Sequence, residues 1–110
     1  MNKSLICPRF EKAMGILSQR WTGMIIYQLL SGPQRNCTIK SATGISGRLL
    51  SESLKELEEE GIVKREVFPE TPVRIEYSLT EKGLSLEPLM KEIEKWSQEW
   101  LEIDPSSKNN

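Results

Sequence analysis

The side chains of this sequence best arranged for binding chemistry lie on one face of an expected helix running from Ser46 to Gly61. Ser46 can cap the first turn of that helix, and Gly61 supplies the left-handed residue that commonly ends one. Helical spacing predicts a buried stripe of Leu49, Leu50, Ser53, Leu54 and Leu57 and an outward face of Arg48, Ser51, Glu52 and Lys55. A small, polar and cationic N-terminal face is typical of the helix that a helix-turn-helix inserts into the major groove.

The charge distribution is compatible with a basic surface, although the whole chain carries a net charge of only -1. Residues 1–55 hold eight cations and two acids, whereas residues 56–110 hold seven cations and fourteen acids. The first half therefore has a net charge of +6 and the second half of -7. This asymmetry allows a DNA-binding face, but two ordinary solvated surfaces would explain it equally well.

The sequence offers little for catalysis or for holding a metal. It contains no histidine and only two cysteines, Cys7 and Cys37, so there is neither a paired cysteine motif nor a zinc-ligand cluster. Because no apolar run approaches the ~20 residues of a membrane span, we expect a cytoplasmic protein. Because there are only two cysteines, we expect free thiols in a reducing compartment. We predict that the protein is not an enzyme and needs no cofactor.

The remaining segments predict a mostly α-helical chain with one small β-hairpin. Apolar spacing predicts helices over residues 10–17 and 21–30, and Thr38 is expected to cap a short helix ending near residue 42. In the second helix the expected core residues are Trp21, Met24, Ile25, Leu29 and Leu30.

After Gly61, alternating β-branched and aromatic residues predict strands over 62–68 and 73–79, joined by a turn with two prolines. A last helix is expected from Thr80, broken early near Gly83 and Pro88 and regular over 87–101. This order is that of a winged helix-turn-helix over residues 1–103, followed by a polar tail over 104–110.

Several stretches resemble one family of bacterial transcriptional regulators. The Cys7-Pro8 opening and the run Pro-x-x-Pro-x-Arg-x-x-Tyr-x-Leu-Thr-x-x-Gly over 69–83 are together similar to the HxlR-type family, and the resemblance spans residues 7–101. The sequence departs from the family pattern at Gln19, which replaces a glycine, at Asn36, which replaces an aromatic residue, and over 38–44, which is about one residue short.

The resemblance implies a homodimeric winged-helix regulator that binds double-stranded DNA. Two-fold symmetry then predicts a pseudo-palindromic operator, and a small-molecule effector is left open as a further partner. The predicted DNA-binding residues are Arg35, Lys40, Ser46, Gly47, Arg48, Ser51, Glu52, Lys55, Thr71 and Arg74. The predicted dimer interface comes from the first and last helices and consists of Phe10, Met14, Leu89, Ile93, Trp96 and Trp100. The aromatic content of the last helix supports this, because a small monomer rarely exposes so much apolar surface.

Some members of the family sense oxidants or electrophiles through a cysteine at the place of Cys7, which makes this residue a candidate sensor. The alternative is that Cys7 is a small apolar residue packed in the dimer interface, since free cysteines are often buried. Cys37 is expected to be a local packing or surface thiol. A winged fold that docks a protein partner without specific DNA binding is the alternative function.

Overall fold

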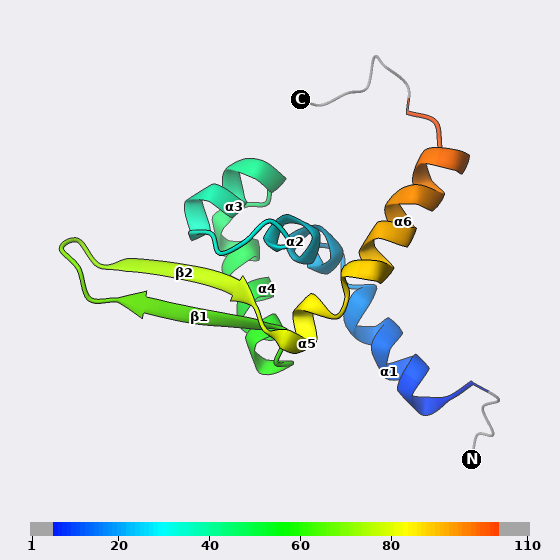
Figure 1. Ribbon diagram of the computed structural model, residues 1–110, viewed down its shortest axis with the longest axis horizontal. Coiled ribbons are helices and arrows are strands. Elements are labelled where there is room, and N and C mark those ends of the chain that lie inside the picture. Colours follow the sequence, from blue (N-terminus) through cyan, green and yellow to red (C-terminus); the bar gives the residue numbers. More distant parts are fainter. Residues whose placement is uncertain (1–5, 104–110) are drawn as a thin grey trace.

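The computed structural model describes residues 6–103, so the predicted tail over 104–110 lies outside the described residues. Its elements are α1 (Pro8–Leu17), α2 (Thr22–Leu29), α3 (Asn36–Thr43), α4 (Gly47–Glu59), β1 (Val63–Phe68), β2 (Arg74–Leu79), α5 (Glu81–Leu84) and α6 (Glu87–Trp100). The hairpin of β1 and β2 projects to one side of α2, α3 and α4, whereas α1 and α6 project to the opposite side (Figure 1). The predicted winged helix-turn-helix is confirmed.

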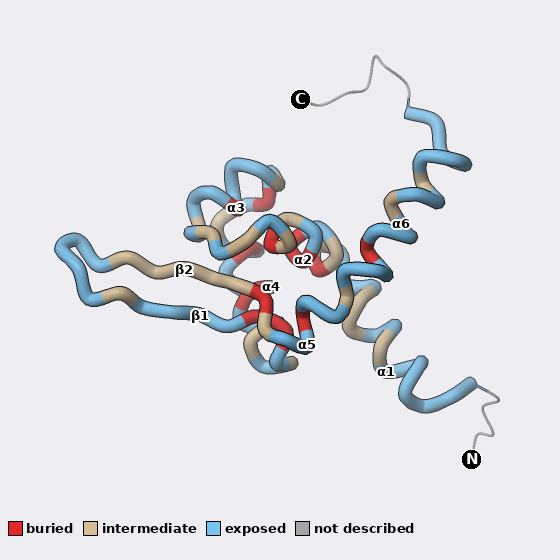
Figure 2. The backbone as a smooth tube through the Cα atoms, viewed as in Figure 1, coloured by how far each residue is buried: buried red, intermediate tan, exposed pale blue. Residues whose placement is uncertain are grey.

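A single apolar core joins the three central helices to the base of the hairpin. Its buried side chains are Ile25, Ile26, Leu29, Ile39, Ile45, Leu50, Leu54, Leu57, Ile62, Val63, Leu79 and Met90. By contrast, α1 buries no residue and α6 buries only Met90 (Figure 2). The terminal helices are therefore held to the central body by few buried contacts.

Both ends of α4 follow the local signals in the sequence. The Ser46 hydroxyl accepts a hydrogen bond of 3.3 Å from the Leu49 amide, and Gly61 adopts a φ of +77° just after the helix. Leu50, Leu54 and Leu57 are buried as predicted. Leu49 is 37% exposed, so the expectation that it belongs to the buried stripe is wrong.

The start of α3 differs from the prediction. The helix begins at Asn36 with Arg35 in the capping position, so Thr38 lies inside the helix and does not cap it. The reason is a long-range contact: Gln34 and Tyr77 exchange two backbone hydrogen bonds of 2.9 and 2.8 Å. These bonds fix Gln34 against β2 just before α3. The helix begins two residues later, where the chain turns away from β2.

The second helix is also less buried than expected. Ile25 and Leu29 are buried, and Trp21 and Leu30 are partly buried against the core. Met24, predicted to be a core residue, is 44% exposed and lines an open groove that also contacts α6. Helical spacing places Met24 on the apolar face of the helix, but it does not show whether that face packs in the core or lines a groove.

The hairpin is antiparallel and in register from Val63 opposite Leu79 to Phe68 opposite Arg74. The middle positions of β1, residues 64–67, are all exposed because the hairpin extends beyond the central body. After β2, the Thr80 hydroxyl accepts a hydrogen bond of 3.1 Å from the Gly83 amide and caps the single turn of α5. The expected break before the last long helix is confirmed.

Candidate nucleic-acid interface

The outward face of α4 carries the polar side chains that the sequence predicts. Arg48, Ser51, Glu52 and Lys55 are all exposed. Arg48 lies 3.5 Å from Glu52 one turn later, but its side chain is 84% exposed. Ion pairs this exposed contribute little stability, so Arg48 is available to an incoming phosphate or base edge.

A second cation lies beside the first turn of α4. A Cβ atom on Gly47 would be 3.6 Å from Nζ of Lys40 in α3, which shows how closely this ammonium approaches the start of α4. Ser46 and Lys40 are both exposed. The first amides of a helix and a nearby ammonium both attract an anion, so this corner of the helix-turn-helix is suited to a DNA phosphate.

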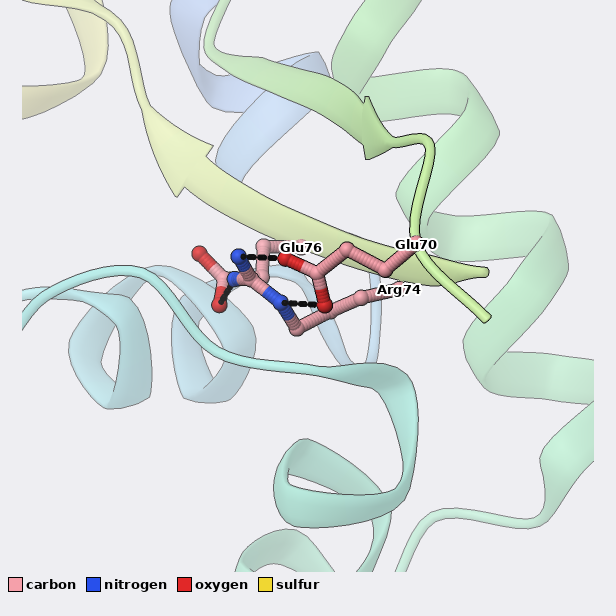
Figure 3. A network of polar contacts seen from close by, with 3 residues as sticks. All are labelled: Glu70, Arg74 and Glu76. Carbon is pink, nitrogen blue, oxygen red and sulfur yellow. Dashed lines mark hydrogen bonds and ion pairs between the residues drawn. The ribbon is translucent and has the colours of Figure 1, made fainter. Parts of the chain in front are cut away.

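The turn of the hairpin is organised around Arg74 (Figure 3). Its guanidinium donates hydrogen bonds of 3.3 and 2.8 Å to the two carboxylate oxygens of Glu70, and it also donates to Glu76. These bonds lower the pKa of Glu70, and the charge of Arg35 acts in the same direction. Thr71 is exposed in the same turn. That Arg35, Thr71 and Arg74 contact DNA stays a prediction.

Glu70 and Glu76 belong to this network but were not among the predicted site residues. Arg74 and Glu76 are two residues apart on one strand, a spacing that puts both side chains on the same face and could have suggested the pair. Glu70 gives no such signal, because only the closed turn brings it to Arg74.

The six predicted interface residues all lie on the two terminal helices and are all exposed. Together Phe10, Met14, Leu89, Ile93, Trp96 and Trp100 are called the terminal-helix surface below. Trp96 is 56% exposed and Trp100 is 70% exposed. So many large apolar side chains on the surface of one domain are typical of an interaction site.

The two cysteines are free and exposed. Cys7 precedes the first residue of α1, and Cys37 lies in α3. The start of α1 and α3 lie on different sides of the molecule (Figure 1). Within residues 6–103 there is no group of three acidic, cysteine or histidine side chains that could hold a metal ion, and no helix there is long and apolar enough to cross a membrane.

Comparison with known proteins identifies the family. The sequence model of the HxlR-like helix-turn-helix proteins matches residues 16–105. The chain belongs to this family. Two relatives from Bacillus subtilis are similar along most of their length. YvaP, an uncharacterized HTH-type transcriptional regulator, is 63% identical over 107 residues, which is 96% of this chain and 97% of YvaP. The HTH-type transcriptional regulator YodB is 44% identical over 98 residues, 88% of each chain.

Solved structures agree with this assignment. The reduced form of YodB from B. subtilis superposes with a TM-score of 0.79 at 43% identity, covering 89% of this chain and 97% of that one. The oxidized form of the redox regulator HypR gives a TM-score of 0.81 at 34% identity, covering 88% and 100%. The protein is thus a DNA-binding transcriptional regulator of the helix-turn-helix type, as the resemblance implied.

Proposed function

We propose that this regulator acts as a homodimer, with α4 of each protomer in the major groove and the hairpin turn against the neighbouring backbone. The observation that supports this most directly is the position of the terminal-helix surface. It lies on the side of the molecule opposite the hairpin and leaves the polar face of α4 exposed. A second copy that covers this surface therefore does not need to cover the residues that face DNA.

Two-fold symmetry has a geometric consequence for the DNA site. It places the two recognition helices on one side of the duplex, about one helical turn or ~34 Å apart. The operator is then pseudo-palindromic. Cations at Lys40, Arg48 and Lys55, present twice in the dimer, release counterions from DNA, so binding weakens steeply as salt rises.

We also propose that Cys7 makes the regulator responsive to oxidants or electrophiles. The support is its exposure and its place directly before the first residue of α1. YodB, which is similar to this chain, has been solved in reduced, diamide-treated and quinone-bound forms. Cys7 lies only a few residues before Phe10 and Met14, which belong to the terminal-helix surface. Modification of its side chain would therefore alter how two protomers pack, and hence the separation of their recognition helices.

The test is a binding titration against the upstream intergenic DNA of the protein's own gene and against a scrambled duplex. Between about 50 and 200 mM salt, we expect specific binding to weaken by roughly a thousandfold or more. A mild thiol oxidant should weaken binding by the unaltered protein but not by the Cys7→Ser variant. Equal affinity for both duplexes at low salt would contradict the proposal and favour a protein-docking module.

Binding that is specific but indifferent to the oxidant would contradict only the role of Cys7. The place to test a small-molecule effector is then the groove between α2 and α6, which has a volume of about 680 Å³ and is lined in part by Met24, Tyr27 and Ile93.

The dimer is tested separately by placing a charge in the terminal-helix surface. Ile93→Lys should convert the protein to a monomer in sedimentation experiments, because an ammonium cannot be buried there without a partner. Gln98→Lys is the matched control, because Gln98 is an exposed polar residue of the same helix. A dimer that survives Ile93→Lys would place the interface elsewhere.

A further inference from the structure

Next to the turn of the hairpin, β2 begins with an arginine whose three nitrogens are all hydrogen-bonded within the protein. Nε and Nη2 of Arg74 donate to the two oxygens of Glu70, at 3.3 and 2.8 Å, and Nη1 donates to Glu76. The guanidinium carbon also lies 3.9 Å from the centre of the Phe68 ring. All three nitrogens of the guanidinium are therefore engaged (Figure 3), and one of its faces lies against the Phe68 ring.

These contacts join the turn to both strands of the hairpin. Phe68 ends β1 and is the register partner of Arg74, Glu76 lies on β2, and Glu70 belongs to the turn itself. The Glu70 amide also donates a hydrogen bond of 2.7 Å to the Phe68 carbonyl. Glu70 is thus held through its backbone to one strand and through its side chain to the other. We call Phe68, Glu70, Arg74 and Glu76 the wing clamp.

The charges of the wing clamp do not favour a direct contact between Arg74 and DNA. Two carboxylates surround one guanidinium, which leaves the cluster with a net charge of -1. The Arg74 side chain is only 25% exposed. A DNA phosphate would have to use the two remaining N–H groups, one on Nη1 and one on Nη2, beside the negative charges of Glu70 and Glu76, or replace the two-pronged carboxylate. Arg48 on α4, exposed and loosely paired, meets no such competition.

We infer that Arg74 is a positioning residue for DNA binding: through the wing clamp it fixes the turn that carries Thr71, and it does not itself bind phosphate. This rests on the proposed function of the hairpin as a DNA-contacting wing. The turn between β1 and β2 has no core of its own, since Pro69, Thr71, Pro72 and Val73 are exposed. The clamp supplies the order that burial does not, and the ordering of the turn is complete before DNA arrives.

Removing the carboxylate partner distinguishes the two roles by the sign of the effect. If Arg74 positions the turn, Glu70→Ala weakens operator binding, by roughly threefold to tenfold for the loss of charge-assisted hydrogen bonds. If Arg74 binds phosphate directly, the same change removes a competitor and strengthens binding. Glu66→Ala is the matched control, because it removes an exposed carboxylate from the same hairpin outside the clamp. It should leave affinity unchanged or raise it slightly.

The salt dependence of operator binding distinguishes a phosphate contact from a structural effect, because a structural effect does not change it. Arg74→Ala should lower operator affinity at every salt concentration and leave the slope of log affinity against log salt unaltered. Loss of one phosphate contact in each protomer would reduce the magnitude of that slope by about 1.8, which is about 0.9 for each contact. Arg74→Lys keeps the charge but cannot form the two-pronged pair, so it should behave like Arg74→Ala. Rescue by lysine or a reduced slope would overturn the inference.

A measurement without DNA separates this inference from the proposed function. In the free protein, the Arg74 Nε proton should be protected from solvent exchange in nuclear magnetic resonance spectra, in the unaltered chain and in Glu66→Ala. Glu70→Ala should abolish the protection. If it does not, the clamp is absent and the inference is wrong. If the clamp is present but the unaltered protein binds no operator, the proposed function fails, and with it the role of Arg74 in DNA binding.

Discussion

The hydroxyl of Tyr27 in α2 donates a hydrogen bond of 2.9 Å to a carboxylate oxygen of Glu94 in α6. This bond joins residues 67 positions apart in the sequence and links the central body to a helix that buries only Met90. The bond raises the pKa of Tyr27, with smaller contributions from desolvation and from the charge of Glu94. The phenol therefore stays protonated at neutral pH, and the link from α2 to α6 persists.

Tyr27→Phe should weaken the coupling between the terminal-helix surface and α4 without unfolding the protein. The ring remains, and only the bond to Glu94 is lost. We expect operator affinity to fall by roughly twofold to threefold. This is the lower end of the range expected for the loss of one hydrogen bond, because Tyr27 is 43% exposed. Affinity for an isolated half-site should not change. The measurement is a pair of titrations on full and half operators.

Tyr77→Phe is the control for the Tyr27 experiment. Its hydroxyl makes no hydrogen bond within residues 6–103, so both affinities should match those of the unaltered protein. An equal loss on the half-site in Tyr27→Phe would show that the bond stabilises α2 itself and not its link to α6.

Gly83→Ala should be one of the most destabilising small substitutions in the chain. A Cβ atom at Gly83 would lie 2.3 Å from the Ile62 carbonyl oxygen and 3.1 Å from a methyl carbon of Leu79. The backbone of α5 must shift away from the hairpin base, so we expect a loss of at least about 2 kcal/mol in the free energy of unfolding. Denaturant titration measures it.

Gly15→Ala in α1 is the matched substitution with the opposite expectation. A Cβ atom there meets nothing within 4 Å, and alanine favours a helix over glycine by roughly 0.5–1 kcal/mol. Gly15→Ala should therefore raise the free energy of unfolding, whereas Gly83→Ala should lower it. Similar stabilities would mean that α5 does not pack on Ile62 as described.

Ser46→Ala tests the predicted cap of the recognition helix. The substitution removes the acceptor of the Leu49 amide and should lower the free energy of unfolding by about 1 kcal/mol. Ser51→Ala, at an exposed position inside the same helix, should be neutral or slightly stabilising because alanine is the better helix former. If both serines behave alike in denaturant titrations, the hydroxyl of Ser46 does not cap α4.

These cases show which features the sequence specifies locally. Ser46 and Gly61 act on amides and dihedral angles within a few residues, and both ends of α4 were predicted. Thr38 failed as a cap because the start of α3 depends on the pairing of Gln34 with Tyr77, more than forty residues away. A pattern read along the chain contains no information about such a pairing.

The same distinction applies to the candidate site. The outward residues of α4 follow from helical periodicity, and their exposure is confirmed. The wing clamp and the bond between Tyr27 and Glu94 were not predicted, since both join side chains that only the folded chain brings together. Arg74 was predicted to matter from a motif, but a motif does not show that two carboxylates already occupy its guanidinium.

The pH dependence of the wing clamp follows from Glu70. Hydrogen bonds from Arg74, and the nearby charges of Arg74 and Arg35, lower the pKa of this carboxylate in the folded protein. A group whose pKa is lower when folded stabilises the fold fully above its unfolded value, about 4.3 for glutamate, and loses that contribution as pH falls through the folded value. The clamp should therefore be intact throughout the neutral range.

We expect the solvent protection of the Arg74 Nε proton to be independent of carboxylate titration from neutral pH down to about pH 4.3 and to disappear only in more acidic solution. Glu70→Ala supplies the baseline, because it lacks the titrating partner. Loss of protection well above pH 4.3 would mean that the Glu70 carboxylate is not stabilised by Arg74. In that case the turn is not ordered in the free protein, and its ordering would have to come from contact with DNA.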